Sequence, residues 1–228
     1  MNTILLDAGG VLVWPNWHRV ADALRARGVA AEAVRLAAGD PHARHALDTA
    51  AIVSGSTDGR RGADYFRFVL THAGVPLSPA VSDALADVYA YHQRTNLWEH
   101  VPAFVVPALG ALRARGYRLA VVSNSNGTLR GALARLGLDG FFDAILDSAE
   151  EQVEKPDPRL FERALARVGA AAAEAIHVGD LYNVDVVGAR AAGVSAVLVD
   201  EAGLTRDPDC PCIRSIAELP DLVAAWAS

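Results

Sequence analysis

Short runs of apolar, β-favouring residues recur along the chain and predict buried strands. They cover residues 3–6, 117–122, 144–146, 175–178 and 196–199. Between the later runs lie helical stretches that end at a glycine just beyond the last apolar position, as helices commonly do. These helices are predicted at 107–115, 129–136, 160–168 and 184–192. Strands that alternate with helices in this way predict an α/β fold, a doubly wound parallel sheet with helices on both faces.

The segment between the first strand and the second has a different pattern. Residues 14–98 show helical spacing of apolar positions, such as Val20 with Leu24 and Leu85 with Val88, and no convincing strand. We therefore expect an all-helical cap domain at 14–98, inserted after the first strand. The α/β core is then formed by 1–13 and 99–228.

Composition and charge narrow the classes of partner. The 228 residues are 52% hydrophobic and 21% charged, with a formal net charge of -6. No apolar run approaches the roughly 18 residues that span a bilayer, and the N-terminus has no basic segment of the kind found in signal peptides. The sequence has no cluster of arginine or lysine that would predict a nucleic-acid surface. We expect a cytoplasmic protein without membrane or nucleic-acid partners, either a monomer or a homodimer, that binds a small anionic substrate at a local positive site.

Polar residues follow the ends of three of the predicted strands. Asp7 follows the first strand, Ser123 and Asn124 follow the second, and Asp180 follows the run at 175–178, with Asp185 five positions later. Each alone is better explained as a helix cap or a loop residue. Ligands of open α/β sheets bind at the carboxyl ends of the strands, so the set together predicts a functional site there.

The basic residue at this site is expected to be Lys155. It is the only lysine in the chain, and it lies in the segment EQVEKPDPRLF, where Pro156 and Pro158 restrict the loop before a helix. An exposed lysine on a solvated loop is the alternative interpretation.

Four motifs occur in order along the chain: DAGGVLV, VVSNSNG, VEKPDP and GDLYNVD, the last followed by GARAAGV. In this order they resemble the motifs of the haloacid dehalogenase-like (HAD) hydrolase superfamily, of the type with a helical cap after the first motif. The resemblance covers nearly the whole chain. It implies a Rossmann-like core with strand order 5-4-1-2-3.

The resemblance also implies roles for individual residues. Asp7 would be the nucleophile that forms a covalent intermediate with the transferred group. Ser123, Asn124 and the main chain at Gly10 would hold the anionic oxygens of the substrate. Lys155 would bind the substrate and neutralise charge on it and on the nucleophile.

A metal site is implied by the same resemblance. Asp7, Asp180 and the main-chain carbonyl of Gly9 would hold Mg²⁺, with Asp185 bound either directly or through water. Magnesium prefers a few carboxylates together with water and substrate oxygens.

The first motif departs from the usual phosphatase pattern. HAD phosphatases carry a second aspartate two positions after the nucleophile, which protonates the leaving group and then activates water. Gly9 occupies that position here. Loss of general acid–base catalysis costs about 10²–10⁴-fold in rate, or about 3–5 kcal/mol, unless another group compensates.

Branches of the superfamily without that aspartate offer alternatives. Phosphonoacetaldehyde hydrolases need a cap lysine that forms a Schiff base. No lysine precedes Lys155, so that chemistry is excluded. 2-Haloacid dehalogenases need no acid for a halide, but they dispense with Mg²⁺ and lack the acidic pair Asp180 and Asp185. A Mg²⁺-dependent hydrolase of a small phosphorylated metabolite is therefore expected, with a dehalogenase and a catalytically weakened metabolite-binding protein as alternatives. His18 could supply a proton or bind substrate, because an imidazole titrates near neutral pH.

Overall fold

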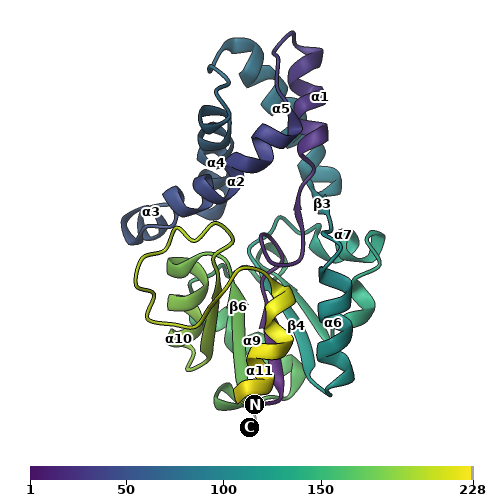
Figure 1. Cartoon of the computed structure of the whole chain (residues 1–228), viewed down its shortest axis with the longest axis vertical. Coiled ribbons are helices and arrows are strands. Elements are labelled where there is room, and N and C mark those ends of the chain that lie inside the picture. The colour runs from purple at the N-terminus through teal and green to yellow at the C-terminus, as the bar shows by residue number, and fades with distance from the viewer. Residues whose placement is uncertain (227–228) are drawn as a thin grey trace. The chain divides into compact units, whose positions relative to one another are not determined.

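The computed structural model describes residues 1–226, apart from the side chains of residues 58 and 59. Two compact units are present, and each is described separately. One comprises Met1–Trp14 together with His100–Ser228, and the other Pro15–Glu99 (Figure 1). The role of the second unit as a cap stays a prediction.

The first unit contains a six-stranded sheet in the order β5-β4-β1-β6-β7-β8, in which every pair of neighbours is parallel. Five of its strands are those that the apolar runs predict, in the expected relative order. They are β1 (Thr3–Leu6), β4 (Arg118–Ser123), β5 (Ala144–Asp147), β6 (Ala175–Gly179) and β7 (Ser195–Val199). The sixth, β8 (Cys212–Ile213), extends the edge beside β7 and was not predicted. Two residues are too few to give an apolar pattern.

The register of the central strands brings their carboxyl ends to one edge. Leu6, the last residue of β1, pairs with Val121 of β4 on one side and with Val178 of β6 on the other. Asp7 therefore leaves the sheet beside the ends of both neighbours, close to where Ser123 ends β4. Parallel pairing of buried strands thus gathers polar residues that are far apart in the sequence.

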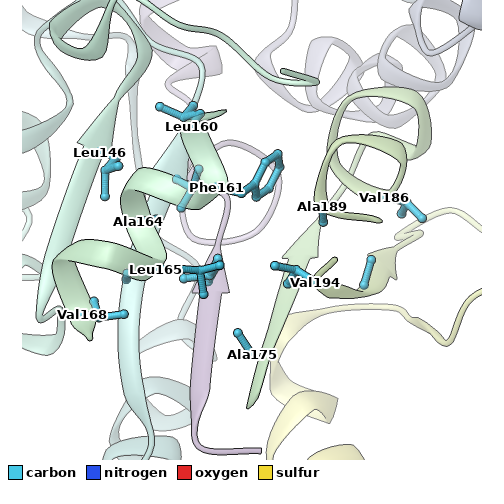
Figure 2. Packing of buried hydrophobic residues seen from close by; sticks show 14 of the residues in the cluster. Leu146, Leu160, Phe161, Ala164, Leu165, Val168, Ala175, Val186, Ala189 and Val194 are labelled. Carbon is cyan, nitrogen blue, oxygen red and sulfur yellow. The ribbon is translucent and has the colours of Figure 1, made fainter. Parts of the chain in front are cut away.

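Helices cover one face of this sheet through a continuous apolar cluster. Along α9 (Pro158–Val168), the buried side chains lie on the side that faces the strands (Figure 2). The helix begins at the cap Asp157 and ends at Gly169, whose φ of 62° is left-handed and suits glycine. Next to α9 is α10 (Val187–Ala191), packed so closely that a Cβ on Gly188 would lie 2.9 Å from the Phe161 ring.

The opposite face is covered as well, since side chains of alternate parity on the central strands, such as Leu6 and Val121, are also fully buried. Here α6 (Val105–Ala114) and α11 (Leu219–Trp226) pack against each other. Two shorter helices follow β4 and β5, namely α7 (Leu129–Arg135) and α8 (Ser148–Glu151).

One predicted helix differs from its expected form. The stretch 184–192 was predicted as a single helix, but Tyr182–Val186 forms a π-helical turn that leads into α10. The π-type bond is the one from the Val187 N–H to the Tyr182 carbonyl, five residues earlier. Within this turn the Asp185 N–H donates to the Leu181 carbonyl at 2.7 Å, and the Asp185 carboxylate accepts from the Leu181 N–H at 3.0 Å. The wider turn folds the carboxylate back toward the sheet, and π-helical turns are frequent at functional sites.

The second unit is helical around its own apolar cluster, which includes Trp17, Leu24, Leu36, Val69 and Val88. Its helices are α1 (Trp17–Ala26), α2 (Ala33–Leu47), α3 (Ala50–Gly55), α4 (Asp58–His72) and α5 (Pro79–Thr95). The expectation of an all-helical insert needs one correction. Short strands β2 (Trp14–Pro15) and β3 (Trp98–His100) form a two-stranded sheet where the chain enters and leaves this unit.

Among the helices of residues 1–226, none combines the length and the apolar character needed to cross a lipid bilayer.

Candidate active site

Asp7 is held at the end of β1 by its own main chain and by a tight turn. Its N–H donates to the Val178 carbonyl at 2.9 Å, which continues the pairing with β6 by one residue. The turn closes where Leu12 and Val13 both donate to the Ala8 carbonyl, each at 2.9 Å. Gly10 has a φ of 69° in this turn, a conformation that favours glycine. Its N–H donates to the Val13 carbonyl, so substrate binding by Gly10 stays a prediction.

Lys155 is buried between two carboxylates. Its Nζ lies 2.6 Å from Asp185 Oδ1 and 2.9 Å from Asp7 Oδ1, and its side chain is 1% exposed. Burial alone would lower the pKa of the ammonium, but the charges of Asp185 and Asp7 outweigh that effect and raise the pKa above its ordinary value. The solvated-loop alternative for Lys155 is therefore wrong, and the lysine is a fixed positive charge beside Asp7.

Both carboxylate oxygens of Asp185 are bonded. Oδ1 accepts from Lys155 and lies 2.9 Å from His177 Nε2, and Oδ2 accepts from the Leu181 N–H. Burial would raise the pKa of this carboxyl, but the Lys155 charge and the His177 hydrogen bond hold the pKa below its usual range. These contacts favour the ionised form of Asp185, whose Oδ1 lies against the Lys155 ammonium.

For the carboxyl of Asp7 the effects that raise the pKa outweigh those that lower it. Burial raises its pKa, and Lys155 offsets this only in part, while the negative charge of Asp185 adds to the rise. A hydrogen bond from the Ser123 side chain favours the ionised form. A further positive charge near Asp7 would therefore stabilise its carboxylate, which is the form that a nucleophile needs.

The Asn124 side chain holds the main chain of Lys155 in place. Its Nδ2 donates to the Lys155 carbonyl at 3.0 Å, and its Oδ1 accepts from the Lys155 N–H at 2.7 Å. Because both ends of the carboxamide are bonded to one main-chain residue, Asn124 acts here as a clamp. A direct contact with the substrate stays a prediction.

The loop after β4 is held by the end of β5, which sequence reasoning missed. Asp147 is fully buried, and its Oδ2 accepts from the N–H groups of Gly127 and Leu129 at 2.9 and 3.2 Å. Ser148 Oγ accepts from the Ser125 N–H at 3.0 Å. The available signal was a polar pair directly after an apolar run, the same signal that identified Asp7 and Ser123.

Three carboxylates converge next to the lysine. Asp7, Asp180 and Asp185 each offer an oxygen, and the three oxygens lie within 4.8 Å of one another. Such an all-oxygen set suits a hard divalent cation such as Mg²⁺. Asp7 Oδ1 is buried and, the Lys155 ion pair apart, has no hydrogen-bond partner among the described residues. The residues present therefore fit a divalent cation, with Asp185 the least accessible of the three.

Two further sequence-predicted residues, Gly9 and His18, have roles that stay predictions. Gly9 offers no side chain, and its predicted main-chain bond to a metal stays a prediction. His18 is exposed on α1 of the second unit, where it lines a cavity of about 370 Å³ with Asn16, Arg19 and Tyr91 among others. Its predicted part in catalysis also stays a prediction.

Comparison with known proteins gives the family. A sequence model of the haloacid dehalogenase-like hydrolases matches residues 1–193. This chain belongs to that family. It is 32% identical over 189 residues to mouse "haloacid dehalogenase-like hydrolase domain-containing protein 3", a match that spans 81% of this chain and 75% of the relative. The predicted family and the predicted hydrolase class are therefore confirmed for this HAD hydrolase.

One further relative in sequence and one solved structure are similar to this HAD hydrolase. The phosphoserine phosphatase of Thermus thermophilus is 37% identical over 164 residues, which are 71% of this chain and 64% of that protein. The fold resembles that of the magnesium-bound putative HAD-hydrolase YfnB from Bacillus subtilis, with a TM-score of 0.70 at 18% identity. That alignment covers 97% of this chain and 98% of the other and supports the fold alone.

Proposed function

We propose that this HAD hydrolase is a Mg²⁺-dependent phosphatase that acts on a small phosphorylated metabolite, with Asp7 as the nucleophile. The observation that carries the proposal is the arrangement of Lys155 and three carboxylates. Lys155 touches Asp7 and Asp185, while Asp7, Asp180 and Asp185 offer oxygens within 4.8 Å of one another. A cation beside a fixed lysine charge favours binding of a phosphoryl group next to Asp7.

Asp7, Asp180 and the carbonyl of Gly9 would hold the metal, with Asp185 bound directly or through water. Bound there, Mg²⁺ would neutralise negative charge on the phosphoryl oxygens and on Asp7. Burial raises the pKa of the Asp7 carboxyl, and a positive charge beside it would favour the ionised form.

The chain's own residues would perform the transfer in two steps. A carboxylate oxygen of Asp7 forms a bond to phosphorus as the bond between phosphorus and the leaving oxygen breaks, and that oxygen keeps the electron pair. Water then attacks phosphorus, which breaks the aspartyl-phosphate bond, releases inorganic phosphate and restores the carboxylate. Lys155 and Ser123 would stabilise the charge on the transferred group during both steps.

The glycine at position 9 restricts the substrates that react well. No carboxylic acid at that position can protonate the departing oxygen, so leaving groups that depart as stable anions are favoured. Acyl phosphates and aryl phosphates belong to this class, whereas alkyl phosphates need a proton from solvent or from another group. The name of the Thermus relative supports a phosphorylated substrate of small size.

The test is phosphate release from p-nitrophenyl phosphate, acetyl phosphate and glycerol phosphate, with Mg²⁺ and with EDTA. We expect Mg²⁺-dependent phosphate release from the first two. In Asp7→Asn the rate of release should fall at least about 10³-fold, since the variant lacks the nucleophile. Full activity in Asp7→Asn would exclude this mechanism. Chloride release from 2-chloropropionate in EDTA, without phosphate release, would instead identify a 2-haloacid dehalogenase. Binding without turnover of either class would identify a metabolite-binding protein.

A further inference from the structure

A histidine inside the central sheet is left unexplained by the proposed chemistry. His177 is completely buried in β6, between Leu5 of β1 and Ala196 of β7 in the sheet register. Both neighbours are apolar and belong to the cluster that packs under α9. Burying a polar ring among apolar side chains is unfavourable unless a hydrogen bond compensates for the hydrogen bonds to water that the ring loses.

The single hydrogen bond of His177 is directed at the carboxylate cluster. Nε2 lies 2.9 Å from Asp185 Oδ1, whereas Nδ1 has no hydrogen-bond partner among the described residues. A carboxylate oxygen only accepts, so Nε2 must carry the hydrogen and donate it. The tautomer of the ring is therefore set by Asp185 and by nothing else in the described structure.

The orientation of the ring is fixed by packing. Phe161 of α9 meets the imidazole edge to face, with ring centroids 4.9 Å apart and planes at 83°. Figure 2 shows the Phe161 side chain reaching from α9 toward α10, the helix that follows the Asp185 turn. The ring is thus held on both sides, by a contact that fixes its plane and by a bond that fixes its direction.

These contacts form a chain of four residues that ends at the nucleophile. His177 donates to Asp185 Oδ1, the same oxygen accepts from Lys155 Nζ at 2.6 Å, and Nζ lies 2.9 Å from Asp7. The Leu181 N–H already holds Oδ2 of this carboxylate at 3.0 Å. The imidazole adds a second donor to Oδ1, which keeps that oxygen directed at the ammonium that lies against Asp7.

We infer that His177 is a positioning residue of the active site, which holds Asp185 so that Lys155 and the carboxylate cluster keep their geometry. The inference rests on the proposed function and deepens it. Residues behind metal ligands that orient them usually affect metal affinity or turnover by about 10–100-fold when they are removed, without touching the substrate.

The test compares His177→Leu with His177→Gln. The amide nitrogen of glutamine reaches close to the position of Nε2 and can donate to Asp185, whereas leucine fills much of the space without a donor. Ile176→Ala serves as the control, because Ile176 is 1% exposed on the same strand and faces the opposite side of the sheet. It perturbs β6 without removing the hydrogen bond.

Two readouts are measured on the full-length protein: Mn²⁺ affinity by calorimetry, without substrate, and kcat and KM on p-nitrophenyl phosphate with Mg²⁺. For His177→Leu we expect Mn²⁺ affinity or kcat to fall about 10–100-fold with KM within about twofold, and for His177→Gln we expect most of the loss to be restored. Ile176→Ala should lower the unfolding midpoint but keep wild-type Mn²⁺ affinity.

A purely structural role for His177 predicts otherwise. Wild-type readouts in His177→Leu, equal losses in the glutamine and leucine variants, or equal losses in Ile176→Ala would overturn the inference. The proposed function fails separately, through full activity in Asp7→Asn or through the absence of Mn²⁺ binding in the wild type.

Discussion

Lys155 and Asp185 form an ion pair in which both side chains are 1% exposed, with Nζ 2.6 Å from Oδ1. A buried charge pair contributes little net stability when both partners are present, because desolvation opposes their attraction. Removal of one partner is different, since it leaves an uncompensated charge in the interior. At this site it would leave two carboxylates, because Lys155 also neutralises Asp7.

Replacement of Lys155 by methionine tests this relationship. Lys155→Met should lower the free energy of unfolding by about 3–5 kcal/mol in the absence of metal and abolish phosphate release. Urea denaturation in EDTA measures the first effect. The control is Arg159→Met, which breaks a solvent-screened pair with Asp157 and should lower the free energy of unfolding far less. Similar losses in the two variants would mean that the buried lysine is not required for charge balance.

Gly179 should be essential because Asp185 folds back against it. A Cβ at position 179 would lie 2.1 Å from Asp185 Cγ, so an alanine there must displace the carboxylate. We expect Gly179→Ala to reduce phosphate release at least tenfold. Gly110→Ala is the matched control: in α6, a Cβ would have no atom within 4 Å, and alanine should stabilise the helix by up to about 1 kcal/mol. Full activity in Gly179→Ala would show that the exact position of Asp185 is unimportant.

An aspartate at position 9 should restore the missing proton donor. Gly9→Asp should raise turnover of glycerol phosphate by about 10²–10⁴-fold, and that of p-nitrophenyl phosphate much less, because nitrophenolate leaves without protonation. Steady-state phosphate release from the two esters gives the ratio. An unchanged ratio would mean that another group already transfers the proton, and His18→Ala in the wild-type background would then be the next variant to measure.

Cys212 should be slow to react despite its exposure. Partial desolvation of the Cys212 thiol, followed by the nearby Cys210 and Asp200, raises its pKa to about 11, although the residue as a whole is exposed. The thiolate is the reactive form, so at pH 8 its alkylation by iodoacetamide should be more than about tenfold slower than that of a free cysteine with a pKa near 8.5. The rate should keep rising with pH to about 11. Mass spectrometry of the wild type and of Cys212→Ser measures it, and a plateau near pH 9 would contradict the prediction.

Much of the fold was predictable because its signals are local. Apolar runs mark strands that are buried on both faces, and a glycine just after a helix, such as Gly169, marks where the helix ends. Polar residues at the carboxyl ends of three strands identified Asp7, Ser123 and Asp180, since parallel pairing brings such ends to one edge. Local signals failed for the two-residue strand β8 and for the π-helical turn at Asp185, where the carboxylate accepts from the Leu181 N–H four residues earlier.

The sequence by itself determined which residue types reach the edge of the sheet: an aspartate, a lone lysine and an acidic pair. Only the tertiary structure decided how they are used. In the folded chain Asn124 binds the main chain of Lys155, and Asp147 binds the loop after β4. His177 donates to Asp185. The physical reason is that a hydrogen bond depends on the direction of two side chains as well as on their positions. Those directions are set by packing, here of Phe161 against His177, which no pattern along the chain records.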